Sequence, residues 1–461
     1  MKKSGMWRFG PFELYPSERK LLESGGDVPL QPKTFDVLLM LVEKAHKLVS
    51  RQELIETVWG GTHVQDANLT NSITTLRRKL GKEAIQTVSK SGYRFNLNVT
   101  STTGISEAAA SLMQDGQAHM HERTTETVTN AKNSFLLAIA EQPEFAEAWA
   151  WLARASRYLE KGGVEPKSNR QLAEAAFRRA FRIDPDLPSA HQFFTNYQTD
   201  CGQVLDALKR LLSRVRKYPV EAQSYAGLVQ VCRFCGLLDA SIRAHKRALE
   251  LDSSIETSIP HTHFARCDYA AVVESYAVIG KGTVRGYLDA AAWASLGSQK
   301  RVAAEITNRL AARSFPPLFE ALLESLLYAI RGDSAKVGEI CLRQDVREDP
   351  ESALYFARHL AWSGSLDPAL ALLRQSLSGG FSVPDMLQKD PWLASLRKEH
   401  TFSAILHEAN QRHECAKEIF RAEGGPQLLM PAGERVQPRS SRALAGRKTK
   451  KTQRSDHRAQ C

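Results

Sequence analysis

The hydrophobic and polar positions divide the chain into zones with different periods. Residues 7–31 alternate apolar and polar side chains in short runs, which predicts half-exposed strands. Residues 112–425 follow the period of paired amphipathic helices, and residues 100–111 (TSTTGISEAAAS) separate the two zones as a linker. Residues 426–461 form a tail that is dense in Lys and Arg and has little apolar periodicity, so we expect it to be disordered.

Three helices are predicted between the first strands and residue 81. Pro32 fits the first turn of a helix that runs to about Ala45. The next helix should begin after Ser50, since Ser50 and Glu53 have the spacing of a capping box. The third should run from Asp66 to about Leu80. The first helix carries one apolar stripe, made of Phe35, Leu38, Leu39 and Val42.

The third helix has two different faces. Its apolar face, which should meet the core, consists of Leu69, Ile73, Leu76 and Leu80. Its polar face consists of Asn68, Asn71, Ser72, Thr75, Arg78 and Lys79. Amides and hydroxyls can read base edges in a DNA major groove, while Arg and Lys bind phosphates. A solvated helix end is the alternative for the basic residues, since the helix dipole favours cations there.

After Gly81, apolar residues alternate on either side of a Ser-Lys-Ser-Gly turn, which predicts a hairpin with Lys90 at its tip and Arg94 beyond it. Three helices followed by a basic hairpin form a winged helix-turn-helix.

Residues 7–99 resemble the DNA-binding domain of the OmpR/PhoB response-regulator family. The stretches LQPKTFDVLLMLVEKAHKLVSRQELIETVWG, NLTNSITTLRRKLG and TVSKSGYRF occur in the order found in that family. The resemblance implies a four-stranded N-terminal sheet, a three-helix core and a C-terminal wing over residues 1–99. It also implies that the third helix enters the major groove and that the wing contacts the minor groove.

The resemblance assigns roles by position. The implied DNA contacts are Asn68, Ser72, Thr74, Thr75, Arg77, Arg78, Lys79, Lys90 and Arg94. Some relatives have an Arg at the position of Thr75, so we expect a different target sequence. The loop that can touch RNA polymerase in this family corresponds to Gly61, Thr62, His63 and Val64. Tandem dimers on direct repeats are a further implication, which no residue pattern tests.

The helical zone repeats, most clearly over residues 112–255. A small–large–small–proline pattern recurs, and from Pro185 to Pro219 to Ser253 the step is 34 residues each time. Its complete copies are Ala131, Phe135, Ala138 and Pro143, and then Ala173, Phe177, Ala180 and Pro185. This zone resembles the tetratricopeptide repeat, and the fold class is therefore an α+β winged helix-turn-helix domain followed by an all-α solenoid. One unit is eight residues too long, which predicts a loop around Gly162 and Pro166.

Composition narrows the chemistry. The net charge of +11 lies at the two ends, with +5 in residues 1–99 and +7 in residues 431–461. Cys232 and Cys235 form one CxxC without a second pair, so we expect them to pack in the core and predict no metal or cofactor. No nucleotide-binding or hydrolase motif is present, which predicts a protein that is not an enzyme. No apolar run is long enough for a membrane span, and we expect a cytoplasmic protein.

The sequence therefore predicts a DNA-binding transcriptional regulator, with activation favoured. A winged helix-turn-helix domain followed by tetratricopeptide repeats resembles HilA-like bacterial activators. We expect no receiver domain for a phosphorelay before the DNA-binding domain. The expected partners are double-stranded DNA, RNA polymerase through the loop after the second helix, and an unknown protein or small ligand in the repeat groove. The alternative is an adaptor that acts mainly through its repeats.

Overall fold

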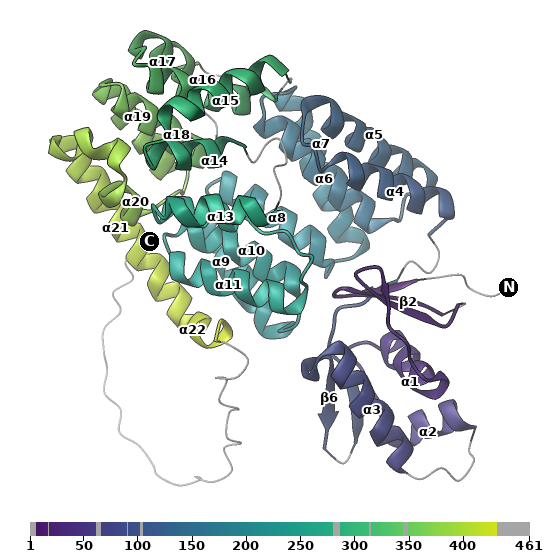
Figure 1. Ribbon diagram of the computed structural model, residues 1–461. Coiled ribbons are helices and arrows are strands. Elements are labelled where there is room, and N and C mark those ends of the chain that lie inside the picture. Colours follow the sequence, from purple (N-terminus) through teal and green to yellow (C-terminus); the bar gives the residue numbers. More distant parts are fainter. Residues whose placement is uncertain are drawn as a thin grey trace, which may run out of the picture.

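The computed structural model describes residues 6–16, 18–60, 66–89, 91–101, 105–279, 286–312, 315–343 and 349–430. Figure 1 shows a small N-terminal domain of strands and helices next to a larger body made of helices. We call the larger body, residues 107–430, the helical array. The predicted fold class, an α+β winged helix-turn-helix domain followed by an all-α array of tetratricopeptide type, is confirmed.

The first sheet of the N-terminal domain is antiparallel and has the strand order β4-β3-β2-β1-β8. Its strands are β1 (Trp7–Phe9), β2 (Phe12–Tyr15), β3 (Lys20–Glu23), β4 (Gly26–Asp27) and β8 (Thr100–Ser101). Four strands were expected, and the fifth comes from the segment assigned to the linker. β1 would otherwise expose an open edge of N–H and C=O groups, and β8 pairs with that edge opposite Trp7 and Arg8.

The remainder of the N-terminal domain is a three-helix core with a second sheet, in the order β5-β7-β6. Its elements are α1 (Pro32–Glu43), β5 (Leu48–Ser50), α2 (Arg51–Trp59), α3 (Asp66–Leu80), η1 (Lys82–Ala84), β6 (Ile85–Val88) and β7 (Gly92–Phe95). The predicted capping box is present: Ser50 accepts from the Glu53 amide, and the Glu53 side chain accepts from the Ser50 amide. Gly60 ends α2 in the left-handed conformation.

The array begins with regular helical hairpins. These are formed by α4 (Glu107–His119), α5 (Thr125–Glu141), α6 (Ala146–Lys161), α7 (Pro166–Ile183), α8 (Pro188–Asp200), α9 (Val204–Lys217), α10 (Ala222–Phe234) and α11 (Leu238–Leu251). Small residues let the helices approach closely, since a Cβ on Gly116 would lie 2.4 Å from the Phe135 ring. Gly202 and Gly236 make the turns with φ of +77° and +70°. The predicted tetratricopeptide-type pattern is confirmed here.

Less regular helices complete the array. They are α12 (Ile259–Ala265), α13 (Tyr269–Ile279), α14 (Gly286–Ser295), α15 (Gln299–Ala312), α16 (Pro317–Arg331), α17 (Ser334–Cys341), α18 (Pro350–Trp362), α19 (Leu366–Ser378), α20 (Pro384–Lys389), η4 (Pro391–Lys398), α21 (His400–Ala422) and α22 (Gly425–Leu428). Of the helices in the described ranges, none combines the length and the apolar character that a membrane span requires.

Three expected boundaries differ from the structure. The linker 100–111 is interrupted by β8 and by α4, which starts early because the Ser106 side chain caps it. The loop expected around Gly162 is only a short turn, residues 162–165, because the extra residues lengthen α6 to 16 residues and α7 to 18. The segment 426–430, assigned to the tail, contains the end of α22, and Leu429 is buried in the core. Residues 431–461 lie outside the described ranges.

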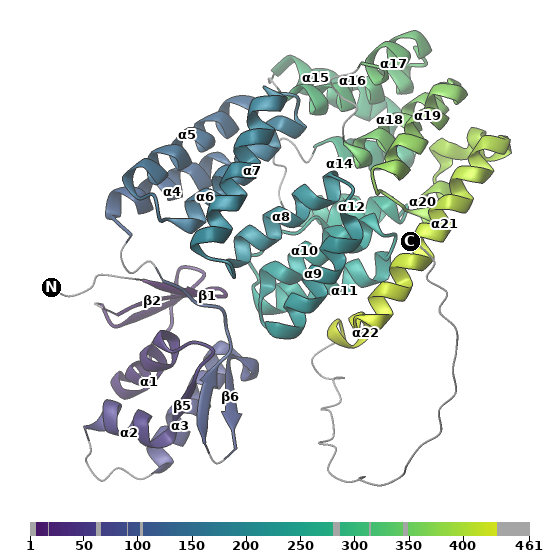
Figure 2. The same cartoon turned by 180° about the vertical axis from the view of Figure 1, so that it is seen from behind.

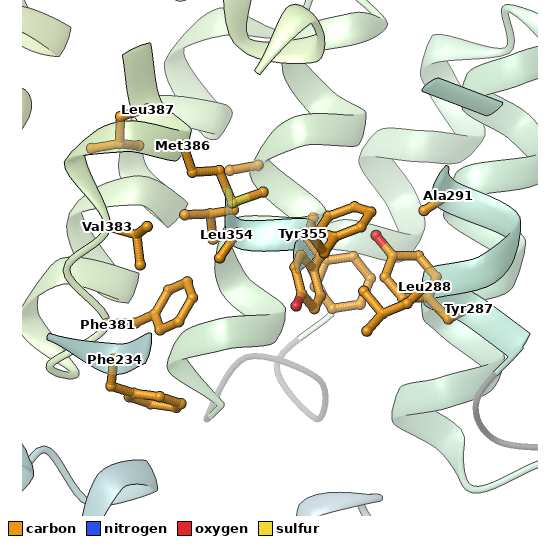
Figure 3. Packing of buried hydrophobic residues seen from close by; sticks show 14 of the residues in the cluster. Phe234, Tyr287, Leu288, Ala291, Leu354, Tyr355, Phe381, Val383, Met386 and Leu387 are labelled. Atoms are coloured by element: carbon orange, nitrogen blue, oxygen red, sulfur yellow. The ribbon is translucent and has the colours of Figure 1, made fainter. Parts of the chain in front are cut away.

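Buried apolar residues form separate clusters. One is formed by residues of the helices from α4 to α8, and a larger one is formed by residues from α9 to Leu429. Figure 3 shows part of the larger cluster, in which Phe234 of α10 meets Phe381 edge to face at 4.9 Å. In the same view Tyr287 of α14 and Tyr355 of α18 lie 5.3 Å apart. The later helices therefore pack sideways onto the earlier hairpins rather than only onto their sequence neighbours.

The array closes on itself. The ring of Tyr158, near the end of α6, stacks on Phe319 of α16 at 5.5 Å. The Leu318 amide donates to the Gly162 carbonyl at 3.1 Å, and Lys161 lies 2.8 Å from Asp349, just before α18. Figures 1 and 2 both show α15 and α16 beside α6 and α7. An open, one-dimensional stack would not make these contacts.

Candidate nucleic-acid interface

The third helix is held by its apolar face, as predicted. Leu69, Ile73, Leu76 and Leu80 are buried in the core of the N-terminal domain. Asn68, Asn71, Thr74, Arg78 and Lys79 are exposed on the opposite side, and Thr75 is half-buried. The helix thus presents amide and hydroxyl groups along its length and two cations at its C-terminal end.

Ser72 does not belong to this exposed face. Its side chain is 7% exposed, and its hydroxyl shares a hydrogen bond of 3.3 Å with Thr34 of α1. Ser72 lies three residues after Leu69 and four before Leu76, which places it at the buried edge of the helix. In the structure Ser72 therefore joins α3 to α1, and it does not reach the surface where a base would lie.

Arg77 is also occupied within the domain. Its guanidinium donates to the Ile85 carbonyl at 3.0 Å from Nε and 2.8 Å from Nη2, and to the Thr87 hydroxyl at 2.6 Å. These bonds fix β6, the first strand of the wing, to the C-terminal end of α3. Arg77 is thus a residue that positions the wing, a role the sequence pattern did not reveal.

Arg78 and Lys79 are the available cations of α3. Both are exposed, and neither makes a hydrogen bond or ion pair within the part of the chain that the structure describes. They lie in the last turn of the helix, where the dipole favours positive charge. Flexible, unpaired cations of this kind can bind phosphate groups.

The wing is the hairpin of β6 and β7. β7 can approach β5 closely because residue 92 is a glycine, and a Cβ there would lie 2.0 Å from the Val49 carbonyl oxygen. Ser91 is exposed at the turn, whereas Arg94 is half-buried near the base of the hairpin. Lys90 and the proposed polymerase-contact residues Gly61, Thr62, His63 and Val64 lie outside the described residues.

Polar side chains of the array's early hairpins are paired within the chain itself. Lys161 of α6 lies 2.8 Å from Asp349 and 3.5 Å from Asp200 of α8. Arg233 of α10 lies 3.1 Å from Glu351 at the start of α18. Nearby cations hold the pKa of the buried Glu351 carboxyl far below its usual range despite desolvation. Lys161 and Arg233 of the early hairpins are thus bound by residues at the N-terminal end of α18.

The described residues contain no cluster of three or more His, Cys, Asp or Glu that could hold a metal ion. Cys232 and Cys235 are buried, as the packing interpretation predicted. Burial raises the pKa of Cys232 to about 12, so its thiol is a poor nucleophile and a poor ligand.

Three core helices and a β-hairpin that follows the third define the N-terminal domain as a winged helix-turn-helix. Residues 25–95 match the family model "Transcriptional regulatory protein, C terminal", and the predicted OmpR/PhoB-type domain is thereby confirmed. The match covers this domain and not the array.

Known proteins resemble the same region. "Transcriptional regulator HilA" of Salmonella typhi is 41% identical over 80 residues, covering 16% of this chain and 14% of HilA. "Response regulator SaeR" of Staphylococcus aureus (strain USA300) is 38% identical over 78 residues, covering 16% and 34%. The solved DNA-binding domain of E. coli CadC is 29% identical, covering 21% of this chain and 97% of that one with a TM-score of 0.20. The alignments thus span a minor part of both regulators.

Proposed function

We propose that this protein is a sequence-specific, DNA-binding transcriptional regulator, and that it acts as an activator. The observation that carries the proposal is the polar face of α3, with Arg78 and Lys79 exposed and unpaired within the described chain, beside a wing fixed to α3 by Arg77. A helix with this face fits a major groove. The match of residues 25–95 to a transcriptional-regulator family supports the same function.

The proposal assigns each residue a role that follows from its position. Asn68, Thr74 and Thr75 read base edges, because they are the amide and hydroxyl groups on the accessible face. Arg78 and Lys79 bind phosphates. The remaining proposed contacts are Lys90 and Arg94 on the wing, with Gly61, Thr62, His63 and Val64 as the contact to RNA polymerase.

Ser72 and Arg77 act indirectly in this proposal. Ser72 fixes α3 to α1, and Arg77 fixes α3 to the wing, so both determine the shape that meets DNA. The proposed protein has no catalytic role and needs no cofactor. A location in the cytoplasm, where promoter DNA is accessible, is part of the same proposal.

Selection of random duplex DNA on the full chain tests this function. The wild type should enrich one motif, and a Thr75→Ala/Arg78→Ala variant should lose the enrichment. An Arg178→Ala variant is the matched control, because Arg178 is an exposed arginine of α7 with 69% of its side chain accessible. Equal loss in the control, or no motif with the folded wild type, would contradict the proposal.

The adaptor alternative is the second candidate. The observation in its favour is the size of the array, which makes up most of the described chain. Lys161 of α6 pairs with Asp200 of α8 and with Asp349 before α18, and Arg233 of α10 pairs with Glu351 of α18; these internal ion pairs argue against an open groove for a peptide or small ligand. We therefore propose that a partner of the array contacts its outer surface. Absence of a DNA motif in the selection would favour this candidate.

A further inference from the structure

The N-terminal domain contacts the array at a position that is distant in sequence. The chain leaves this domain into α4, yet the contact lies at the turn between α9 and α10. Val220 of that turn is 6% exposed and belongs to the apolar core of the N-terminal domain. Leu251, at the end of α11, packs against both this core and the core of the array. We call residues 218–221 the docking turn.

Polar contacts accompany this apolar one. The Asn98 side chain, beyond the wing, donates a hydrogen bond to the Glu221 carboxylate. Glu221 is almost fully buried and also accepts from Arg214 Nε at 2.7 Å and from the Ser224 hydroxyl. The rings of His46 and Tyr218 lie 5.6 Å apart. Glu221 is therefore held by the array on one side and meets the N-terminal domain on the other.

The docking turn connects to α3 through the base of the wing. The His46 amide donates to the Phe95 carbonyl at 2.8 Å, and the Asn96 amide donates to the Ala84 carbonyl at 2.9 Å. Phe95 ends β7, which pairs with β6, and Arg77 bonds β6 to α3. The array thus touches the base of the wing, while both views show β6 running away from the array.

We propose that the docking turn is a built-in binding site for the N-terminal domain, and that it holds the base of the wing in the orientation that binds DNA. The inference rests on the proposed function. Docking favours DNA binding and does not block it, because the exposed face of α3 is free of the array. The turn between α9 and α10 is therefore the place where a change in the array reaches the DNA-binding surface.

Energy coupling between two sites is reciprocal. If docking favours the DNA-bound shape, then DNA must strengthen docking by the same factor. A substitution at the docking turn can change DNA affinity by no more than the free energy of the docking contacts that it removes. Loss of one partly buried hydrogen bond of ordinary net strength corresponds to a change of about three- to tenfold.

Hydrogen exchange of the full chain, with and without the duplex selected by the wild type, tests the inference. Amides of the docking turn should exchange more slowly when DNA is added. In Asn98→Ala they should exchange faster without DNA, DNA should slow them less, and DNA affinity should fall about three- to tenfold. Asn410→Ala removes a matched side-chain bond, from Asn410 to the Leu406 carbonyl on α21, and should change none of these.

A second variant, Tyr218→Ala, removes the ring contact from the array side and should act in the same direction. Unchanged exchange of the docking turn in both folded variants would overturn the docking site. Faster exchange with equal or higher DNA affinity would overturn the coupling to the DNA-bound shape. If the wild type binds no duplex, the proposed function fails with that coupling, while exchange without DNA still decides whether the docking contact exists.

Discussion

The polar face of α3 and the polar side chains of the array's early hairpins both carry basic residues, but these residues make different contacts. On α3, Arg78 and Lys79 are exposed and unpaired within the described chain. In the array, Lys161 and Arg233 are partnered by Asp349 and Glu351, at the N-terminal end of a helix distant in sequence. One set of charges is available to another molecule, whereas the other stabilises the protein's own shape. The exposure of a charged side chain, and not its charge alone, therefore distinguishes a binding surface from an internal ion pair.

The comparison would fail most clearly if one partner of an internal ion pair could be removed without destabilising the array. Arg358 and Asp390 form an ion pair with both side chains fully buried. Asp390→Ala leaves a buried guanidinium unpaired and should destabilise the array by about 3–5 kcal/mol. Urea unfolding followed by helical circular dichroism measures this. Asp385→Ala, in an exposed pair with Lys389, is the control and should cost less than about 1 kcal/mol.

Acid should also weaken the array. Arg210 donates to His191 Nδ1 at 2.9 Å, so the ring is neutral, and burial lowers the pKa of His191 to about 4. Burial likewise lowers the pKa of His359 well below its usual range. The folded chain then binds fewer protons than the unfolded chain at pH below about 6.5, so stability falls as the pH falls.

Between pH 7 and pH 5 a single such histidine should cost roughly 2 kcal/mol. Urea unfolding at the two pH values measures the loss. His191→Gln should unfold with a smaller pH dependence than the wild type. Equal stability at both pH values would show that these rings are protonated without penalty, against the neutral state inferred from their contacts.

Two adjacent arginines of α3, Arg77 and Arg78, test the same comparison within one helix. Arg77→Ala removes the bonds to Ile85 and Thr87 and should destabilise the wing by about 1–2 kcal/mol, seen as faster amide exchange in β6 and β7. Arg78→Ala should leave this exchange unchanged and weaken DNA binding about five- to tenfold. The same loss of protection in both variants would mean that the two arginines do not differ in role.

The smallest effect concerns the capping box of α2. Ser50→Ala removes the acceptor for the Glu53 amide and should cost about 1 kcal/mol of N-terminal domain stability. Ser334→Ala removes an exposed hydroxyl bond in the array and serves as control. Amide exchange of residues 51–59 measures the difference, and a change confined to the control would rule out a stabilising cap.

Local signals predicted most of the fold. The capping box at Ser50, the apolar stripe of α3 and the turn glycines at Gly202 and Gly236 act within a few residues, so the sequence reveals them directly. The burial of Ser72 was missed because its hydroxyl placed it with the polar residues, although its spacing from Leu69 and Leu76 puts it at the buried edge of α3. The bonds of Arg77 to the wing depend likewise on tertiary placement.

Contacts between distant segments could not be predicted. β8 pairs with β1 across the whole N-terminal domain, and the docking turn lies far from residues 46 and 98 in sequence. The pairing of α6 with α18 depends on the curvature of the entire array. None of these contacts leaves a periodic signature, because each involves one or two residues whose partners are set by the fold.

The closure of the array, where Gly162 meets Leu318, has a consequence for folding and for evolution. In an open solenoid, repeats nucleate anywhere and can be gained or lost one at a time. Here the segments that meet are distant in sequence, so a large loop must close before the contact forms, which slows folding. A duplicated or deleted hairpin between α8 and α15 would shift the two meeting points apart. The number of hairpins in that interval is therefore fixed by geometry.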